Sequence, residues 1–170
     1  SRDHNDVDRL EDLQTALAYA QEACEIFSKN IIEPGRHVEA LIELGCVYRD
    51  YAKYSRQGFK VTTKSKLYGT KSEESLVLAA KIAKREKIIF RAVDALVNLA
   101  WLKYYLRENV DYVLSKALAQ IPSKFLKIHN RGVSLKDMDT LVVPYQTLLG
   151  KAHALKGQLH FSLFNDRKIT

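Results

Sequence analysis

The 170-residue chain contains little proline and little glycine, with three and seven residues respectively. Both residues interrupt helices and mark turns, so their scarcity argues against a β-rich or loop-rich protein. Because 46% of the residues are hydrophobic, and Ala, Leu, Lys and Glu are abundant, the composition also argues against a disordered chain. It predicts a soluble, all-α protein of ordinary single-domain size.

Long apolar runs and clustered cysteines are also missing. The apolar stretch 92–102 contains Asp94 and Asn98 and is much shorter than the roughly 20 residues that cross a bilayer. We therefore expect no transmembrane helix, and the polar N-terminus has no signal-peptide pattern. Cys24 and Cys46 occupy predicted core-facing helical positions, so buried reduced thiols are favoured over a disulfide. This favours a cytoplasmic location.

The sequence has no recognisable catalytic or metal-binding pattern. Its five histidines include no pair spaced by four residues, and its two cysteines lie 22 residues apart. A glycine-rich phosphate loop and a Gly-x-Ser-x-Gly motif are both absent. His153 and His160 are interpreted as a packing residue and a surface residue. We therefore expect a non-enzymatic protein with no metal site and no cofactor.

The net charge of +7 is distributed unevenly along the chain. Residues 1–30 carry seven acids and three bases, whereas residues 53–91 carry eleven bases and three acids. The first segment therefore has a net charge of −4 and the second a net charge of +8. Such an asymmetry can steer an anionic partner toward the middle of the chain.

Apolar residues recur at helical spacing along most of the chain. The period is lost between residues 55 and 72, where Lys, Thr and Ser accumulate, and this predicts a long basic insert that is a loop or a short hairpin. Ser72 is the expected N-cap of the helix that follows, and Gly157 is expected to end the last helix. The predicted helices cover residues 12–29, 36–51, 73–86, 89–107, 110–120 and 141–155, with a short helix after Ser134.

A leucine followed by a small residue recurs every 50 to 55 residues within these helices. The pairs are Leu44-Gly45, Leu99-Ala100 and Leu149-Gly150, and Tyr48 follows the first pair. Ala16, Ala20 and Ala23 form a second pattern of small residues in the first predicted helix. The two patterns resemble helix A and helix B of the tetratricopeptide repeat. Gly or Ala in helix A lets helix B approach closely, and the aromatic residue fills the adjoining space.

The resemblance implies antiparallel helical hairpins stacked as a short α-solenoid, with residues 1–170 in a single domain. The distance between Ala83 and Ala100 is similar to that in the long-linker repeats of bacterial signalling proteins. Both ends of the chain fall inside repeats, so we expect part of a longer protein, or self-association through uncapped ends. The alternative is an irregular helical bundle in which the Leu-Gly pairs arise by chance.

The concave face of a tetratricopeptide array is lined by helix A, so the resemblance implies a protein-interaction or ligand-sensing module of a scaffold or signalling protein. Some tetratricopeptide proteins bind a C-terminal carboxylate with Lys and Asn at fixed positions of helix A. Acids occupy the corresponding positions here, which favours a basic or mixed-charge partner. Trp101 and its neighbouring tyrosines are suited to anchoring a partner, although packing between helices is an equal alternative. The implied groove residues are Glu39, Cys46, Arg49, Asp94, Asn98, Trp101, Tyr104 and Lys151.

The basic stretch supports a second hypothesis, contact with nucleic acid. Its lysines and arginine can neutralise phosphates, and Phe59 and Tyr68 can stack on bases. A solvated charged loop is the simpler interpretation, and a membrane contact is not expected because the stretch lacks an apolar face. The candidate basic contact residues are Arg56, Lys60, Lys64, Lys66 and Lys71.

Overall fold

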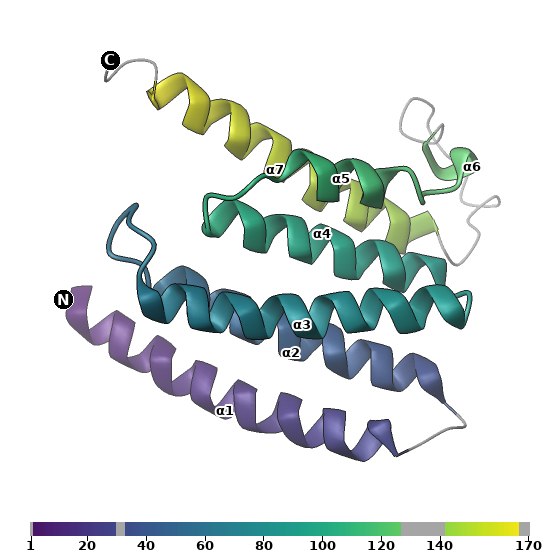
Figure 1. Cartoon of the computed structure of the whole chain (residues 1–170), viewed down its shortest axis with the longest axis horizontal. Helices are drawn as coiled ribbons and strands as arrows, with labels where there is room; N and C mark the ends of the chain where they lie inside the picture. Colours follow the sequence, from purple (N-terminus) through teal and green to yellow (C-terminus); the bar gives the residue numbers. More distant parts are fainter. Residues whose placement is uncertain (1, 30–32, 127–141, 167–170) are drawn as a thin grey trace.

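A computed structural model shows the chain as a set of packed helices (Figure 1). The structure describes residues 2–29, 33–126 and 142–166, and the side chains of residues 11–29, 33–123, 125 and 144–162. Across these residues the predicted all-α class is confirmed. The helices are α1 (Arg2–Ser28), α2 (Pro34–Tyr54), α3 (Thr63–Arg85), α4 (Ile89–Tyr105), α5 (Asp111–Leu118), α6 (Ser123–Leu126) and α7 (Val142–Asp166).

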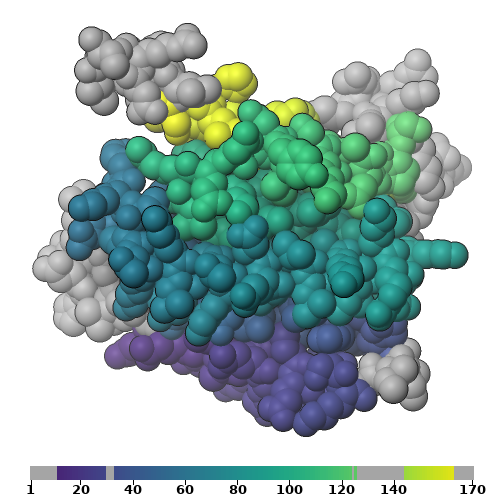
Figure 2. Space-filling view, viewed as in Figure 1, coloured from purple at the N-terminus to yellow at the C-terminus, as the bar shows by residue number. Residues whose placement is uncertain are grey.

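Helices α1 to α4 each pack against the next one along the chain, and α4 also packs against α2 and α7. Figure 1 shows α3 and α5 in front of α2 and α7, with α1 at one edge of the molecule. In the space-filling view, the segment from α3 to α5 covers the middle of this face (Figure 2). Because α4 packs against both α2 and α7, these three helices form a row.

Two clusters of buried apolar side chains hold the helices together. The larger cluster joins α3 and α4 to α5 and α7 through leucines that include Leu76, Leu102 and Leu155, each fully buried. The smaller cluster joins α2 to α3 and α4 and is rich in alanine, including Ala79 and Ala92. Because these alanines are small, the backbones of the three helices can approach closely.

Helix α3 begins at Thr63, about three turns before the predicted start at residue 73. Thr62 caps it, because its hydroxyl accepts a 3.0 Å hydrogen bond from the amide of Ser65. The Ser65 hydroxyl in turn accepts a hydrogen bond from the Thr62 amide, which completes a capping box. The predicted long insert is therefore wrong for residues 63–72, and the loop between α2 and α3 covers only residues 55–62.

Ser72 is buried within α3 instead of capping it. Its hydroxyl donates a 2.7 Å hydrogen bond to the carbonyl oxygen of Gly45 in α2. Ser65, Gly69 and Ser72 are all buried at helical spacing, so small residues form the inward face of this part of α3. The spacing of apolar residues did not predict the first part of α3, because Ser and Gly are not counted as apolar.

The three leucine-small pairs have different surroundings. A Cβ atom added at Gly45 would lie 2.6 Å from Cγ of Leu76, so the expected close approach of the next helix is found there. Ala100 is fully buried in the larger cluster. A Cβ atom at Gly150 would meet no atom within 4 Å among the described residues. Among the described residues, the third pair therefore does not mark a close helix contact.

Several helix ends differ from the predictions. Helix α1 begins at Arg2, well before the predicted residue 12, and α7 continues through Gly157 to Asp166. Helix α3 ends without a glycine. Lys87 adopts the positive φ of 59° that glycine usually supplies at a helix end, and the Ile88 amide donates a 2.8 Å hydrogen bond to the Ala83 carbonyl oxygen. The short helix predicted after Ser134 lies outside the described residues.

Candidate functional site

Charged side chains from α2, α4 and α7 form a row of alternating sign, which we call the ionic row. Glu39 on α2 pairs with Arg91 on α4, and with Arg36 on its own helix at 3.3 Å. Asp94, one turn after Arg91, pairs with Lys151 on α7 at 3.4 Å. Arg91 also lies 4.0 Å from Asp94, which makes the row continuous across the three helices.

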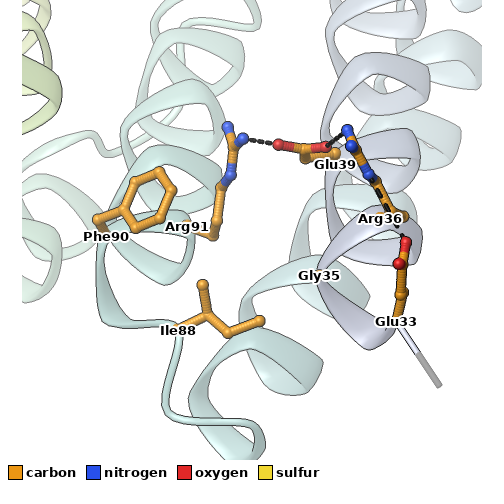
Figure 3. A pocket seen from close by; sticks show the side chains of 7 residues that line it. All are labelled: Glu33, Gly35, Arg36, Glu39, Ile88, Phe90 and Arg91. Carbon is orange, nitrogen blue, oxygen red and sulfur yellow. Dashed lines mark hydrogen bonds and ion pairs between the residues drawn. The ribbon is translucent and has the colours of Figure 1, made fainter. Parts of the chain in front are cut away.

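Two open hollows lie along the ionic row. The first, of about 520 Å³, is formed where α2 and α4 begin, and Figure 3 shows Arg36 and Arg91 converging on Glu39 from the two helices. The second, of about 410 Å³, lies between α4 and α7. Because Phe90 and Arg91 line both hollows, the two adjoin. Ile88 and Gly35 also line the first hollow; Pro144, Thr147 and Leu148 line the second.

Arg91 is the central residue of this surface. Its guanidinium carbon lies 4.7 Å from the ring centroid of Phe90. Burial lowers the pKa of Arg91, Asp94 opposes this shift, and Arg36 adds to it. The side chain stays positive near neutral pH because an arginine pKa starts so high. Including Glu33, 3.8 Å from Arg36, the surface carries three bases and three acids in paired arrangement.

Further along α2 and α4, the predicted groove residues are engaged in contacts between the helices. Arg49 donates a 2.5 Å hydrogen bond to Oδ1 of Asn98, and the Asn98 amide donates to the carbonyl and carboxylate oxygens of Asp94, both at 3.0 Å. Arg49 also pairs with Asp50 at 3.0 Å and contacts the Cys46 sulfur at 3.7 Å. These polar atoms therefore join α2 to α4 within a largely covered contact.

Burial raises the pKa of the Cys46 thiol to about 11, and the positive charge of Arg49 opposes part of this shift. A neutral thiol is a poor nucleophile and a poor metal ligand at neutral pH. Burial also raises the pKa of Cys24. Among the described side chains, no group of three or more His, Cys, Asp or Glu residues is placed to hold a metal ion.

Trp101, Tyr104 and Tyr105 form a cluster of three rings near the end of α4. Their ring centroids lie 5.6 to 5.9 Å apart. Trp101 and Tyr104 pack against the larger apolar cluster, and the Tyr104 hydroxyl lies 3.2 Å from the hydroxyl oxygen of Ser162 on α7. These contacts place Trp101 and Tyr104 partly in helix packing, and each stays only partly exposed.

The five predicted basic contact residues do not share one face. Arg56 and Lys60 belong to the loop before α3. Lys64 and Lys71 are exposed and lie two turns apart on the same side of α3. Lys66 is also exposed but points about 200° away from Lys64 around the helix axis. The structure therefore divides the predicted surface into a loop part and two faces of α3.

The sequence pattern did not predict Arg36, Phe90 or Arg91 as site residues. Arg91 was counted only as part of the basic stretch, although it precedes the predicted groove residue Asp94 by one helical turn. An opposite charge at that spacing signals a local ion pair. The contact with Glu39 has no such signal, because it joins residues of two different helices.

None of the helices in the described part of the chain is both long and apolar enough to cross a membrane. Comparisons with protein-family models, curated proteins and solved structures found no match to this chain. The tetratricopeptide resemblance therefore depends on the chain's own residues.

Proposed function

We propose that the face formed by α2, α4 and α7 binds an extended segment of a partner protein, as the groove of a tetratricopeptide-like array. The observation that carries this proposal is the pair of adjoining hollows, which run from α2 to α7 past Phe90 and Arg91. An open track over three helices suits an extended chain better than a small molecule, because small-molecule pockets enclose most of their ligand.

The pattern of helix contacts supports an arrangement of stacked hairpins. Helices α2 and α4 pack against each other, and each packs against the helix that follows it. Helix α7 continues the row by packing against α4. The contact of Gly45 with Leu76 supplies the close approach that such hairpins use. In this proposal α2, α4 and α7 are the helices that line the groove.

The ionic row favours a partner segment with charges of both signs. The pair of Arg36 with Glu33, in which both side chains are more than 60% exposed, contributes about 0–1 kcal/mol, so a ligand can exchange it at small cost. A carboxylate of the ligand can pair with Arg91 or Arg36, while a basic side chain can pair with Asp94. A strongly basic partner is less suitable than the sequence suggested, because Arg91 and Lys151 already neutralise Glu39 and Asp94.

The proposed activity is binding without chemical conversion, in a scaffold or sensor role. The acids of the groove are held in ion pairs, and the nearby Cys46 thiol is neutral at physiological pH. Neither group is therefore poised as a general base or a nucleophile.

The proposal is tested by selecting peptides from a displayed random library on the immobilised chain and measuring their affinity by calorimetry. Phe90→Ala and Arg91→Ala are each expected to lower the affinity for the selected peptides about tenfold or more, as loss of a central interface residue does. The exchange Lys151→Glu should alter which charges the selected peptides carry. Unfolding curves for each variant show whether the fold is retained.

Matched controls lie outside the groove. Tyr112 on α5 is 72% exposed, and Arg85 at the end of α3 is exposed as well. Tyr112→Ala and Arg85→Ala should leave peptide affinity within about twofold of the original, as expected for residues outside an interface. Peptides that bind the groove variants and the original chain equally well would place the binding surface elsewhere.

A further inference from the structure

Positive charge gathers at the opposite end of α2 and α4 from the two hollows. In the ionic row every base pairs with a carboxylate. Lys53, Arg56, Lys60 and Arg107, in contrast, pair with no carboxylate among the described side chains. Three of these cations lie over aromatic rings, at 5.1 to 5.6 Å from the ring centroids. The nearby acids Asp50 and Glu108 are already paired, with Arg49 and Lys103.

The loop between α2 and α3 presents an aromatic ring to solvent. Reciprocal backbone hydrogen bonds of 3.1 and 3.0 Å between Gln57 and Lys60 close a tight turn, with Gly58 at a φ of 59°. Phe59 at the tip is 78% exposed, and the guanidinium of Arg107 lies 5.4 Å from its ring centroid. The turn therefore holds the ring out from the surface in a defined position.

Arg56 fastens this loop to the end of α4. Its guanidinium donates a 3.2 Å hydrogen bond to the carbonyl oxygen of Tyr105 and lies 5.6 Å from the centroid of the Tyr105 ring. Lys53 lies near the rings of Tyr54 and Tyr105, and Tyr54 is 44% exposed. Cations and exposed rings therefore share one surface, the basic aromatic platform, made of Lys53, Tyr54, Arg56, Phe59, Lys60 and Arg107.

We propose that the basic aromatic platform binds single-stranded nucleic acid. Cations without carboxylate partners can contact backbone phosphates without first giving up an internal ion pair. An exposed ring such as Phe59 can stack on an unpaired base of any sequence. Phosphate contact and base stacking are the two interactions that single-strand binders combine, and here one short loop and the ends of two helices supply both.

Other anionic partners fit the platform less well. An acidic peptide would be anchored by side chains that enter desolvated pockets, whereas both hollows described above lie at the far end of α2 and α4. The bases of a duplex are already stacked and paired, so Phe59 could reach them only after unstacking. We therefore expect the platform to prefer single strands over duplexes. Binding should not depend on sequence, because stacking on a ring does not read the hydrogen-bonding edges of the bases.

The test uses fluorescence anisotropy with short labelled oligothymidylate and oligouridylate over a range of salt concentrations. Four phosphate contacts predict a slope of about −3 for the logarithm of the binding constant against that of salt, at about −0.7 for each contact. Phe59→Ala should weaken binding about tenfold or more with little change in slope. Lys60→Gln and Arg107→Asn should each reduce the slope by about 0.7.

The variants are chosen to preserve the fold. Phe59 is largely exposed, and Asn tolerates the positive φ of 58° that Arg107 adopts. Phe161→Ala provides a matched control, because Phe161 is a 63% exposed ring on α7. Lys84→Gln removes an exposed lysine at the far end of α3. Both controls should bind the oligonucleotides like the original chain.

The proposal is overturned if no binding is detected at low salt, or if Phe59→Ala binds as tightly as the original chain. It is also overturned if polyglutamate or duplex DNA competes as well as the single strand, since either result identifies a general polyanion surface. The platform does not depend on the proposed groove. Arg91→Ala should leave oligonucleotide binding unchanged, so failure of one proposal is distinguishable from failure of the other.

Discussion

Arg49 on α2 donates a 2.5 Å hydrogen bond to Asn98 on α4, although the two residues lie 49 positions apart in the sequence. Asn98 is only 4% exposed, and its amide group is also bonded to Asp94. Burial opposes the charged form of Arg49, but Cys46 and Asp50 hold its pKa above the ordinary value. The pair therefore contributes to the contact between α2 and α4 with a permanently charged donor.

Replacing Asn98 by Ala is expected to destabilise the fold by about 1–3 kcal/mol, because a partly buried charged donor loses its acceptor. Urea unfolding of Asn98→Ala, Arg49→Met and the double variant measures the coupling, which should be about 0.5–3 kcal/mol. Peptide affinity of the folded variants should stay close to the original. Lost peptide affinity without lost stability would instead make the pair a ligand contact.

Gly45→Ala is expected to lower the free energy of unfolding by about 1–2 kcal/mol. The added methyl group would lie 2.6 Å from Cγ of the fully buried Leu76, and such overpacking outweighs the roughly 1 kcal/mol that Ala gains over Gly in a helix. Gly150→Ala is the matched control, because its methyl group would enter open space among the described residues. It should stabilise by up to about 1 kcal/mol, and equal effects of the two substitutions in urea unfolding would contradict the packing.

Thr62→Ala is expected to cost about 1 kcal/mol, since it removes the side-chain cap of α3. Hydrogen exchange should be faster at the amide of Ser65, because this amide loses the hydrogen bond that it donates to the Thr62 hydroxyl. Thr70→Ala, at an exposed position within the same helix, should be neutral or slightly stabilising. A helix that began near residue 73 would show no effect of Thr62→Ala on stability.

The stability of the fold is expected to fall as pH rises from about 9 to 11. Burial raises the pKa of Cys46 from 9.0 to about 11, so over this range the unfolded chain releases the thiol proton and the folded chain retains it. The unfolded state then binds fewer protons, and this one group lowers the free energy of unfolding by about 1.4 kcal/mol per pH unit.

Comparison of the original chain with Cys46→Ala isolates this contribution. Burial also raises the pKa of Tyr51, Tyr105 and Tyr145, so some alkaline loss of stability remains in the variant. Urea unfolding at a series of pH values should show a shallower decline for Cys46→Ala. Parallel declines for the two proteins would mean that the thiol titrates at its ordinary pKa in the fold.

The start of α3 shows where sequence patterns were insufficient. The residues that face inward, Ser65, Gly69 and Ser72, have helical spacing but no apolar character. Gly69 is required to be small, because an added Cβ atom would lie 2.7 Å from Leu106. Tyr68 meanwhile stacks on Tyr51 of α2 at 4.8 Å between ring centroids. Such a helix is stabilised by contacts with its neighbours, which a local pattern does not contain.

Three residues of the ionic row were among the residues predicted from the sequence. Glu39, Asp94 and Lys151 do meet across three helices, but Arg91 completes the row, and it was not selected. Spacing along a helix identified which side each residue occupies. It did not identify the pairing of Glu39 with Arg91, because that contact depends on the register between α2 and α4.

The sequence by itself determined the helical class, the location of most helices and the close approach at Gly45, because spacing, composition and residue size act locally. The tertiary structure decided the remainder. It converted most of the expected basic insert into helix, engaged Arg49 and Asn98 in packing, and brought together Phe90 and Arg91 between two hollows. These outcomes depend on which side chains from separate helices meet, and that is set by the free energy of packing the whole chain.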